Sequence, residues 1–389
     1  MRFTNLNKLV KVRLGDICTI TGGYAFDSLK MTQKGEYQII KMGNLYNGIF
    51  DLSRNSSFIN APTKKELDYL IQENDILITL TGTTNKKDYG YTVQMEQPKN
   101  LLLNQRCALI RASKVNEKYL FYLLNSNDFL KQFYASSTGG TGNQTNVSIN
   151  DMLDFKVCIS NENDQLKISN ILSALDKKIL TQIKIIDDLV LQKKYIISSL
   201  LKSIQDNEKI MLKDILFDYN IKTTINNEYP VLSSTASGMY LQSDYFNKET
   251  SSDNTIGYKI VPRGYCTYRS MSDTGLFTFN IQNLVEKGIV SPAYPVFSSN
   301  DDYINEFIIL YLNNSSYIKK QILELKSGGT RFALPFSTLC TLKIPKLEKE
   351  KQLSLIKTIT AFERKIENEE IILNALHQQK IFLLNNMFI

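Results

Sequence analysis

Two polar segments in the first half of the chain combine side chains that could bind a nucleic acid. Lysines can hold phosphate groups, while amides and hydroxyls can read base edges, with Asn and Gln suited to adenine in the major groove. The candidate DNA contacts in these segments are Thr83, Thr84, Asn85, Lys86, Lys87, Tyr89, Tyr91, Asn143, Gln144 and Asn146. A solvated surface loop without a partner has a similar composition and is the alternative interpretation.

The second half contains two comparable segments, at residues 268–273 and 328–332. Their candidate DNA contacts are Arg269, Ser270, Arg331 and Phe332. The net charge of +7 permits binding to nucleic acid without requiring it.

The sequence has few groups that could catalyse a reaction. Its single histidine, His377, falls on an exposed-looking position of the last expected helix. The sequence contains neither a Gly-x-x-x-x-Gly-Lys-Ser/Thr phosphate loop nor the Asn-Pro-Pro-aromatic tetrapeptide of amino-methyltransferases. Its five cysteines occur singly, which predicts reduced thiols rather than disulfides or a metal site. We therefore expect no catalytic residue, no metal and no cofactor.

The elements that must position the polar segments occur twice, about 187 residues apart. Residues Gln165–Ile179 align without a gap with Gln352–Ile366, and Gln, Leu, Ala, Lys and the closing Ile are identical. A Gly-Gly loop precedes each copy, at 138–141 and 327–330, and similar motifs open each half at 14–17 and 212–215. This order predicts a duplicated module of domain size rather than a solenoid. Chance similarity between two amphipathic helices is the alternative.

Each copy begins a long amphipathic helix whose apolar residues alternate at spacings of three and four, as in a coiled coil. Antiparallel packing of the two helices predicts a register in which Lys193 lies opposite Glu369 and Gln182 lies opposite Lys380. Polar residues in such a seam commonly fix the alignment of the helices. The alternative is that each helix belongs to the core of its own domain.

The bodies between these anchors alternate short apolar strands with turn signals. In the first body, we expect strands at 37–40, 75–79 and 107–110 and a helix at Glu117–Phe133. In the second, we expect strands at 228–232 and 265–268 and a helix at Tyr303–Leu325. The predicted fold is mixed α/β (α+β), with two duplicated globular domains separated by two long helices that pack as an antiparallel, pseudo-two-fold coiled coil. The expected boundaries are 1–160 and 206–347 for the domains, and 161–205 and 348–389 for the helices.

Composition places the chain among globular proteins. At 389 residues it should contain two or three domains, and 43% hydrophobic residues suffice for sizeable cores. It has no apolar run of about 18 residues and no signal-peptide core near its start, which predicts a cytoplasmic protein without a membrane partner.

The duplicated order of a Gly-Gly loop, a short strand and a Gln-led helix resembles the specificity subunits of type I restriction–modification systems. In the second copy, this order runs from the loop at 328–332 through 343–345 to Gln352. In the first copy, Phe155–Ile159 leads into Gln165. The opening motif at 12–17 and the segment Glu73–Ile78 also resemble family landmarks, and the resemblance spans nearly the whole chain.

The resemblance implies two target-recognition domains, each reading one half of a split sequence in double-stranded DNA, with the helices measuring the unread spacer. It implies no catalytic activity in this chain, because two modification subunits would methylate adenine and restriction subunits would cleave. The first copy departs from the family in having Ser160–Asn163 where prolines usually follow the strand. The alternatives are a coiled-coil scaffold without a DNA role and a self-contained DNA methyltransferase or nuclease.

Overall fold

The computed structural model describes residues 9–139, 143–245, 254–325 and 332–388, which form two compact units. Unit 1 contains residues 1–183 and 371–389, and unit 2 contains residues 184–370. Each unit therefore has a mixed α/β body and one end of both long helices. The predicted fold class is confirmed, whereas the exact domain boundaries stay a prediction.

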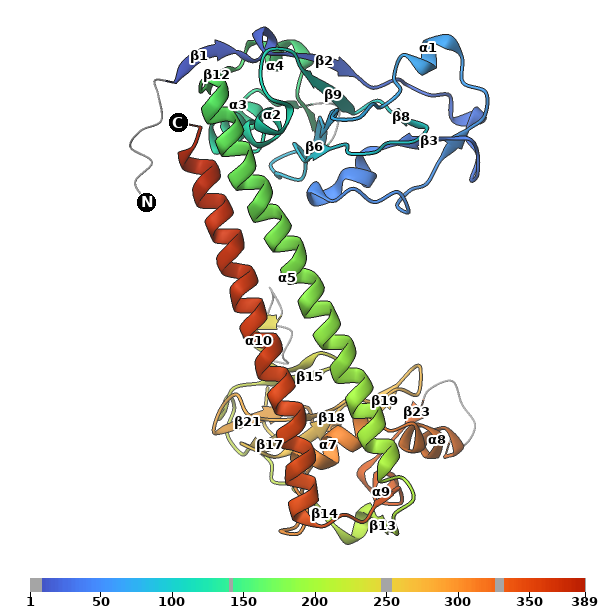
Figure 1. The fold of residues 1–389 in the computed structure, drawn as a ribbon. Coiled ribbons are helices and arrows are strands. Elements are labelled where there is room, and N and C mark those ends of the chain that lie inside the picture. The colour runs from blue at the N-terminus through green and yellow to red at the C-terminus, as the bar shows by residue number, and fades with distance from the viewer. Residues whose placement is uncertain (1–8, 140–142, 246–253, 326–331, 389) are drawn as a thin grey trace. The chain divides into compact units, whose positions relative to one another are not determined.

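The long helices are α5, Glu162–Ser203, and α10, Lys349–Asn386. They lie side by side in Figure 1. In unit 1, Ile168 and Leu172 near the start of α5 share one buried core with Leu383 and Met387 near the end of α10. The two helices are therefore antiparallel, as the heptad pattern predicted.

The predicted register of the helix pair is wrong. Lys193 Nζ lies 3.3 Å from Glu363 Oε1 in unit 2, six residues before the expected Glu369. Lys380 Nζ lies 2.6 Å from Asp176 Oδ1 in unit 1, six residues before the expected Gln182. Asp176 directly follows the buried seam residue Leu175. Ion pairs across a coiled coil commonly use such flanking positions, whereas the prediction paired only seam residues.

The two ion pairs are one interaction that the duplication provides twice. Asp176 and Glu363 hold the same position in the aligned segments, and Lys193 and Lys380 are likewise separated by 187 residues. The sequence thus predicted the symmetry of the polar contacts but chose the wrong acids.

Charge reversal should reveal this register. We expect Lys193→Glu to lower the free energy of unfolding by about 1 kcal/mol, because it faces Glu363 with a like charge at a partly exposed site. Adding Glu363→Lys should restore most of that loss in a double-mutant cycle measured by urea unfolding. Adding Glu369→Lys instead is the matched control. Coupling to position 369 rather than 363 would contradict the register.

The body of unit 1 is built on a four-stranded antiparallel sheet in the order β2-β9-β5-β7. Successive side chains of β5 point to opposite faces, so Ile76 and Ile78 join the core under the helices while Leu77 joins a second core. The second core includes Ile40 from the sheet β4-β3-β8, in which β3 and β8 are parallel. The strand bounds are β2 Cys18–Gly22, β3 Tyr37–Ile40, β4 Phe58–Ile59, β5 Ile76–Thr79, β7 Thr92–Gln94, β8 Leu101–Leu103 and β9 Cys107–Ala112. The expected strands at 37–40, 75–79 and 107–110 are confirmed.

Unit 2 repeats this plan with the sheet β14-β22-β18-β20. The predicted strand at 265–268 is confirmed as β18, whereas the one at 228–232 is wrong, because the strand there, β15, begins at Leu232 and forms a hairpin with β16. The strand bounds are β14 Leu216–Asp218, β15 Leu232–Thr235, β16 Gly238–Leu241, β17 Lys259–Pro262, β18 Cys266–Tyr268, β20 Phe279–Ile281, β21 Lys287–Val290 and β22 Val296–Ser299.

Each helix expected in the bodies is two helices. Residues 117–133 contain α2, Glu117–Leu123, and the start of α3, Asn127–Ala135, while residues 303–325 contain α7, Asn305–Asn314, and α8, Ser316–Glu324. A buried serine breaks each one, Ser126 in unit 1 and Ser315 in unit 2. The Ser126 hydroxyl accepts a hydrogen bond from Phe129 N at 3.3 Å, so it caps a new helix instead of continuing the old one.

Two duplicated glutamines tie each body to its long helix. Gln165 accepts a hydrogen bond from Asn116 N at 3.0 Å and donates one to Ser160 O at 2.8 Å. Gln352 accepts one from Ile304 N at 3.0 Å and donates one to Leu347 O at 2.8 Å. Both side chains are buried, so the repeat in the sequence is a repeat of one structural joint.

The remaining short elements close each body. β1 pairs with β12 in unit 1, and β13 pairs with β24 in unit 2, so each unit joins its opening strand to the strand before its long helix. The bounds are α1 Lys64–Leu67, α4 Ile149–Asp154, α6 Gln242–Tyr245, α9 Phe336–Leu339, β1 Val10–Arg13, β12 Lys156–Ile159, β13 Lys209–Met211 and β24 Lys343–Pro345.

Candidate nucleic-acid interface

A small three-stranded sheet brings the two polar segments of unit 1 together. Its order is β10-β11-β6, with β6 at Thr81–Thr83, β10 at Thr138–Gly139 and β11 at Gln144–Asn146. Gln144 pairs with Thr83 across β11 and β6, and Thr84 N donates to Asn143 O at 2.9 Å. The side chains of Thr84, Asn143, Gln144 and Asn146 are exposed, so this sheet and its turn form one polar surface.

The turn after β6 presents Asn85, Lys86 and Lys87 to solvent. The Asp88 carboxylate holds it in shape by accepting hydrogen bonds from Thr83 N at 2.8 Å and Thr83 Oγ1 at 2.7 Å. These hydrogen bonds lower the pKa of Asp88, which keeps the carboxylate ionised and the turn closed at neutral pH. The exposed lysines therefore stand on a turn with its own internal support.

The two tyrosines of this segment are placed differently from the lysines. Tyr89 is only 2% exposed, and its ring packs against Phe133 and Tyr134 with centroid distances of 5.7 and 5.2 Å. The prediction that Tyr89 contacts DNA is therefore wrong, because its ring belongs to the hydrophobic core. Tyr91 is half-buried and meets Tyr46 edge-on at 5.6 Å.

Sequence reasoning missed Arg106, in the turn between β8 and β9. Its side chain is exposed, and its carbonyl accepts a hydrogen bond from Leu80 N at 2.8 Å, one residue before β6. Its φ of +76° is rare for a residue with a side chain and often marks a functional position. With Lys41, Asn104 and Gln105, it lines a hollow of about 360 Å³. A polar turn between two apolar strands was the available signal.

Unit 2 builds the corresponding place from β19, Met271–Ser272, and β23, Phe332–Ala333, which pair antiparallel. Arg269 is exposed just before β19, and Phe332 is half-buried on β23. Ser270 is already engaged, because its hydroxyl donates to Ala293 O at 2.9 Å. Arg331 and the two Gly-Gly loops lie wholly or partly outside the described residues.

The described residues contain no cluster of three or more metal-binding side chains. His377 is exposed on α10, as expected. Burial raises the pKa of the Cys18 and Cys107 thiols to about 12, so these two cysteines are protonated and unreactive. No helix in the described part of the chain is long and apolar enough to cross a membrane.

Comparison with known proteins agrees with this geometry. The model of the type I restriction modification DNA specificity domain matches residues 7–189. The fold resembles the S subunit of a type I restriction–modification system from M. genitalium, with 15% identity, a TM-score of 0.55, and coverage of 100% of this chain and 98% of the other. A second structure, titled for complex assembly and conformational transition of the type I R-M system, has 14% identity, a TM-score of 0.60, and coverage of 98% and 97%. The chain belongs to the family of type I restriction modification DNA specificity proteins.

Proposed function

We propose that this chain is the DNA-recognition subunit of a type I restriction–modification complex, in which residues 1–160 and 206–347 each read one half of a bipartite target. The observation that carries the proposal is the pairing of β6 with β11, which unites two polar segments in one surface, together with the analogous pairing of β19 with β23. Two such surfaces in one chain are suited to two half-sites, whereas one catalytic pocket needs no second copy. Methylation and cleavage would belong to separate subunits.

Within the surface of unit 1, the side chains divide into two tasks. Lys86, Lys87 and Arg106 would hold phosphates, which fixes the position of the protein on the duplex without reading sequence. Asn143, Gln144 and Asn146, listed here as the exposed amides beside them, would read base edges. In unit 2, Arg269 would take the phosphate-binding task.

Charge reversal at the turn tests this division. We expect Lys86→Glu with Lys87→Glu to weaken DNA binding by the assembled complex at least about tenfold and to reduce its salt dependence, because phosphate contacts release counterions. Fluorescence anisotropy at several salt concentrations would measure both effects. Lys64→Glu with Lys65→Glu is the matched control, since these lysines are also exposed in unit 1 but lie on α1. Equal losses in both double variants would contradict the assignment.

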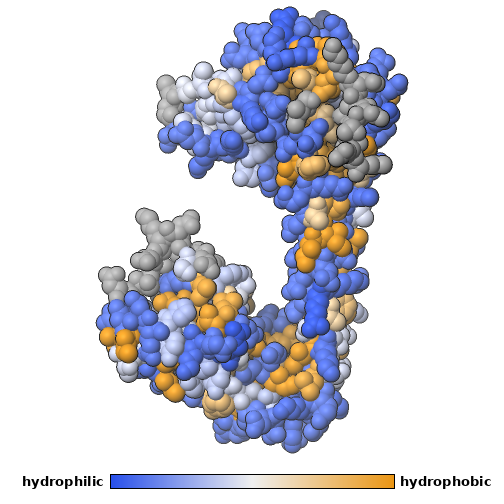
Figure 2. Space-filling view, turned by 90° about the vertical axis from the view of Figure 1, so that its left-hand side faces the viewer, coloured by the Kyte–Doolittle hydropathy of each residue, from blue (hydrophilic) through white to orange (hydrophobic). Residues whose placement is uncertain are grey.

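The long helices, residues 161–205 and 348–389 in the proposed organisation, would set the unread spacer and bind the modification subunits. Figure 2 shows apolar surface in orange along the helices. Large apolar side chains are exposed at three pairs of equivalent repeat positions: Leu166 and Leu353 (49% and 42%), Ile185 and Ile372 (38% and 45%), and Tyr195 and Phe382 (74% and 60%).

Exposed apolar residues that recur in both copies support a binding surface that is used twice. Two identical partners fit this duplication, which is why we assign the surface to two modification subunits. Restriction subunits would then join the complex as its cleaving components.

The aromatic pair supplies the test of this surface. We expect Tyr195→Ser and Phe382→Ser each to weaken the binding of one modification subunit at least about tenfold, since exposed aromatic residues often dominate interfaces. Native mass spectrometry should show complexes with one modification subunit in place of two. Leu180→Ser is the control, because Leu180 is 59% exposed but its equivalent is the charged Glu367. Full two-copy assembly with both aromatic variants would refute the surface.

A further inference from the structure

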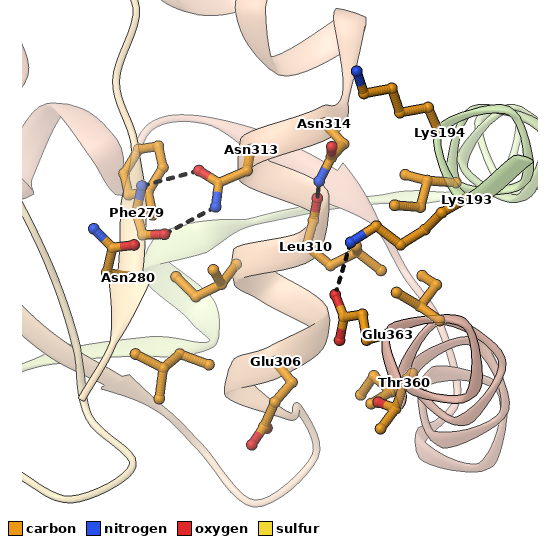
Figure 3. A pocket seen from close by; sticks show the side chains of 15 residues that line it. Lys193, Lys194, Phe279, Asn280, Glu306, Leu310, Asn313, Asn314, Thr360 and Glu363 are labelled. Carbon is orange, nitrogen blue, oxygen red and sulfur yellow. Dashed lines mark hydrogen bonds and ion pairs between the residues drawn. The ribbon is translucent and has the colours of Figure 1, made fainter. Parts of the chain in front are cut away.

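Unit 2 contains an open pocket where its long helices meet α7 and β20. Its volume is about 510 Å³, and its polar lining includes Lys193 and Lys194 of α5, Asn280 of β20, and Glu363 of α10. Figure 3 shows the Lys193–Glu363 ion pair at its edge and Leu310 of α7 beside it. Ile309, Ile359 and Phe279, listed here as neighbouring lining residues, add apolar walls.

Unit 1 shows what occupies the equivalent place. The duplicated glutamines accept hydrogen bonds from Asn116 N and Ile304 N, which aligns α2 with α7 and sets Tyr122 at the position of Leu310. Tyr122 is 4% exposed, and its hydroxyl donates to Asp176 Oδ2 at 2.8 Å. Burial and the Asp176 charge raise the pKa of the Tyr122 phenol, so it remains a donor.

In unit 2, the acid is present but the phenol is not. Glu363 matches Asp176, and Lys193 contacts it as Lys380 contacts Asp176. Leu310 has no hydroxyl to donate and is shorter than a tyrosine, and the adjoining space is the pocket. The lining thus offers a carboxylate acceptor whose charge is already balanced by a lysine, which favours a neutral donor over a second cation.

We propose that this pocket binds the side chain of a tyrosine from the modification subunit on unit 2, in place of the internal tyrosine of unit 1. The proposal rests on the proposed function, because it assumes that this subunit docks on the adjacent helices. Lys194 lines the pocket, and Leu191, one helical turn away, is 67% exposed, so a partner on the outer helix surface borders the opening. The ring would pack on the apolar walls, and its hydroxyl would donate to Glu363.

The proposal makes the two halves of the chain unequal. The place in unit 1 is closed by Tyr122, so an identical partner there has no pocket to enter. One modification subunit is therefore held more tightly than the other, and Leu310 determines which one.

Binding of p-cresol to the full chain tests the chemistry without any partner. We expect ligand-observed NMR to show one site with a Kd on the order of 1 mM, and weaker binding of toluene, which lacks the hydroxyl. Leu310→Tyr should abolish binding and raise Tm, since the new phenol fills the pocket as Tyr122 does in unit 1. Tyr122→Leu should open a second site. Wild-type protein that binds neither compound, or binds toluene as well as p-cresol, would overturn the proposal.

Titration with modification subunit tests the source of the phenol. We expect Leu310→Tyr to weaken binding of one of the two copies at least about tenfold, while Tyr122→Phe, which removes only the internal hydroxyl, leaves the affinity unchanged. Leu310→Phe serves as a second filling variant if Leu310→Tyr folds poorly. Unchanged affinity in the filled variants would overturn the partner assignment even if p-cresol binds. Failure of wild-type chain to bind the subunit would instead refute the proposed function, and with it this source.

Discussion

Replacing Gln165 with leucine is expected to lower the free energy of unfolding of unit 1 by about 3 kcal/mol. Gln165 is 3% exposed, and its amide satisfies Asn116 N and Ser160 O. Leucine cannot pair with either group, and a buried polar group left without a partner costs about 1–3 kcal/mol. Urea unfolding monitored by circular dichroism would measure the shift in midpoint.

Gln132→Leu provides a matched control in the same unit. Gln132 also makes two backbone hydrogen bonds, donating to Lys156 O and accepting from Lys156 N, both at 2.9 Å. These bonds are exposed, so water can replace the lost amide, and we expect a loss below about 1 kcal/mol. Gln352→Leu should reproduce the large effect in unit 2, where its bonds match those of Gln165. Equal small losses at all three positions would contradict the role of the joint.

Exchanging residues 1–160 for the equivalent domain of another family member is expected to replace one half of the DNA target completely. The physical reason is that the candidate contacts of unit 1 lie on its own small sheet and turns, with no residue contributed from 206–347. Sequencing of methylated sites from cells with the hybrid chain would give the new target. The other half should remain unchanged, and a change in both halves would contradict modular reading.

The parts of the fold that could be predicted from sequence are those that local pattern determines. The repeated helices follow from apolar spacing, and the strands at 37–40 and 107–110 follow from short apolar runs between turns. The duplicated Gln165 and Gln352 marked equivalent joints before their contacts were known. Each of these depends on side chains close together in the chain, or on repetition that can be read directly.

The failures depend on contacts between distant segments. Whether Lys193 meets Glu363 or Glu369 depends on how two helices slide, and heptads repeat too regularly to choose. Tyr89 looked like a loop aromatic because nothing local shows that Phe133 and Tyr134 cover it. Arg106 escaped notice because its place beside β6 comes from the backbone bond to Leu80.

The breaks at Ser126 and Ser315 lie between these extremes. Serine is a common helix cap, so each position was a possible boundary, but the apolar pattern continues across both. The duplication could have resolved this, since a serine at the same place in both copies favours a shared break. Comparing the two halves with each other is therefore more informative than reading either alone.

The central claim is that this chain gives a modification enzyme its sequence specificity. The most direct measurement is a genome-wide map of methylated adenine in the source organism, with and without the gene for this chain. We expect one split motif with a fixed unread gap to lose methylation when the gene is deleted and to regain it on complementation. An unchanged set of methylated motifs in cells that express the chain would contradict the claim.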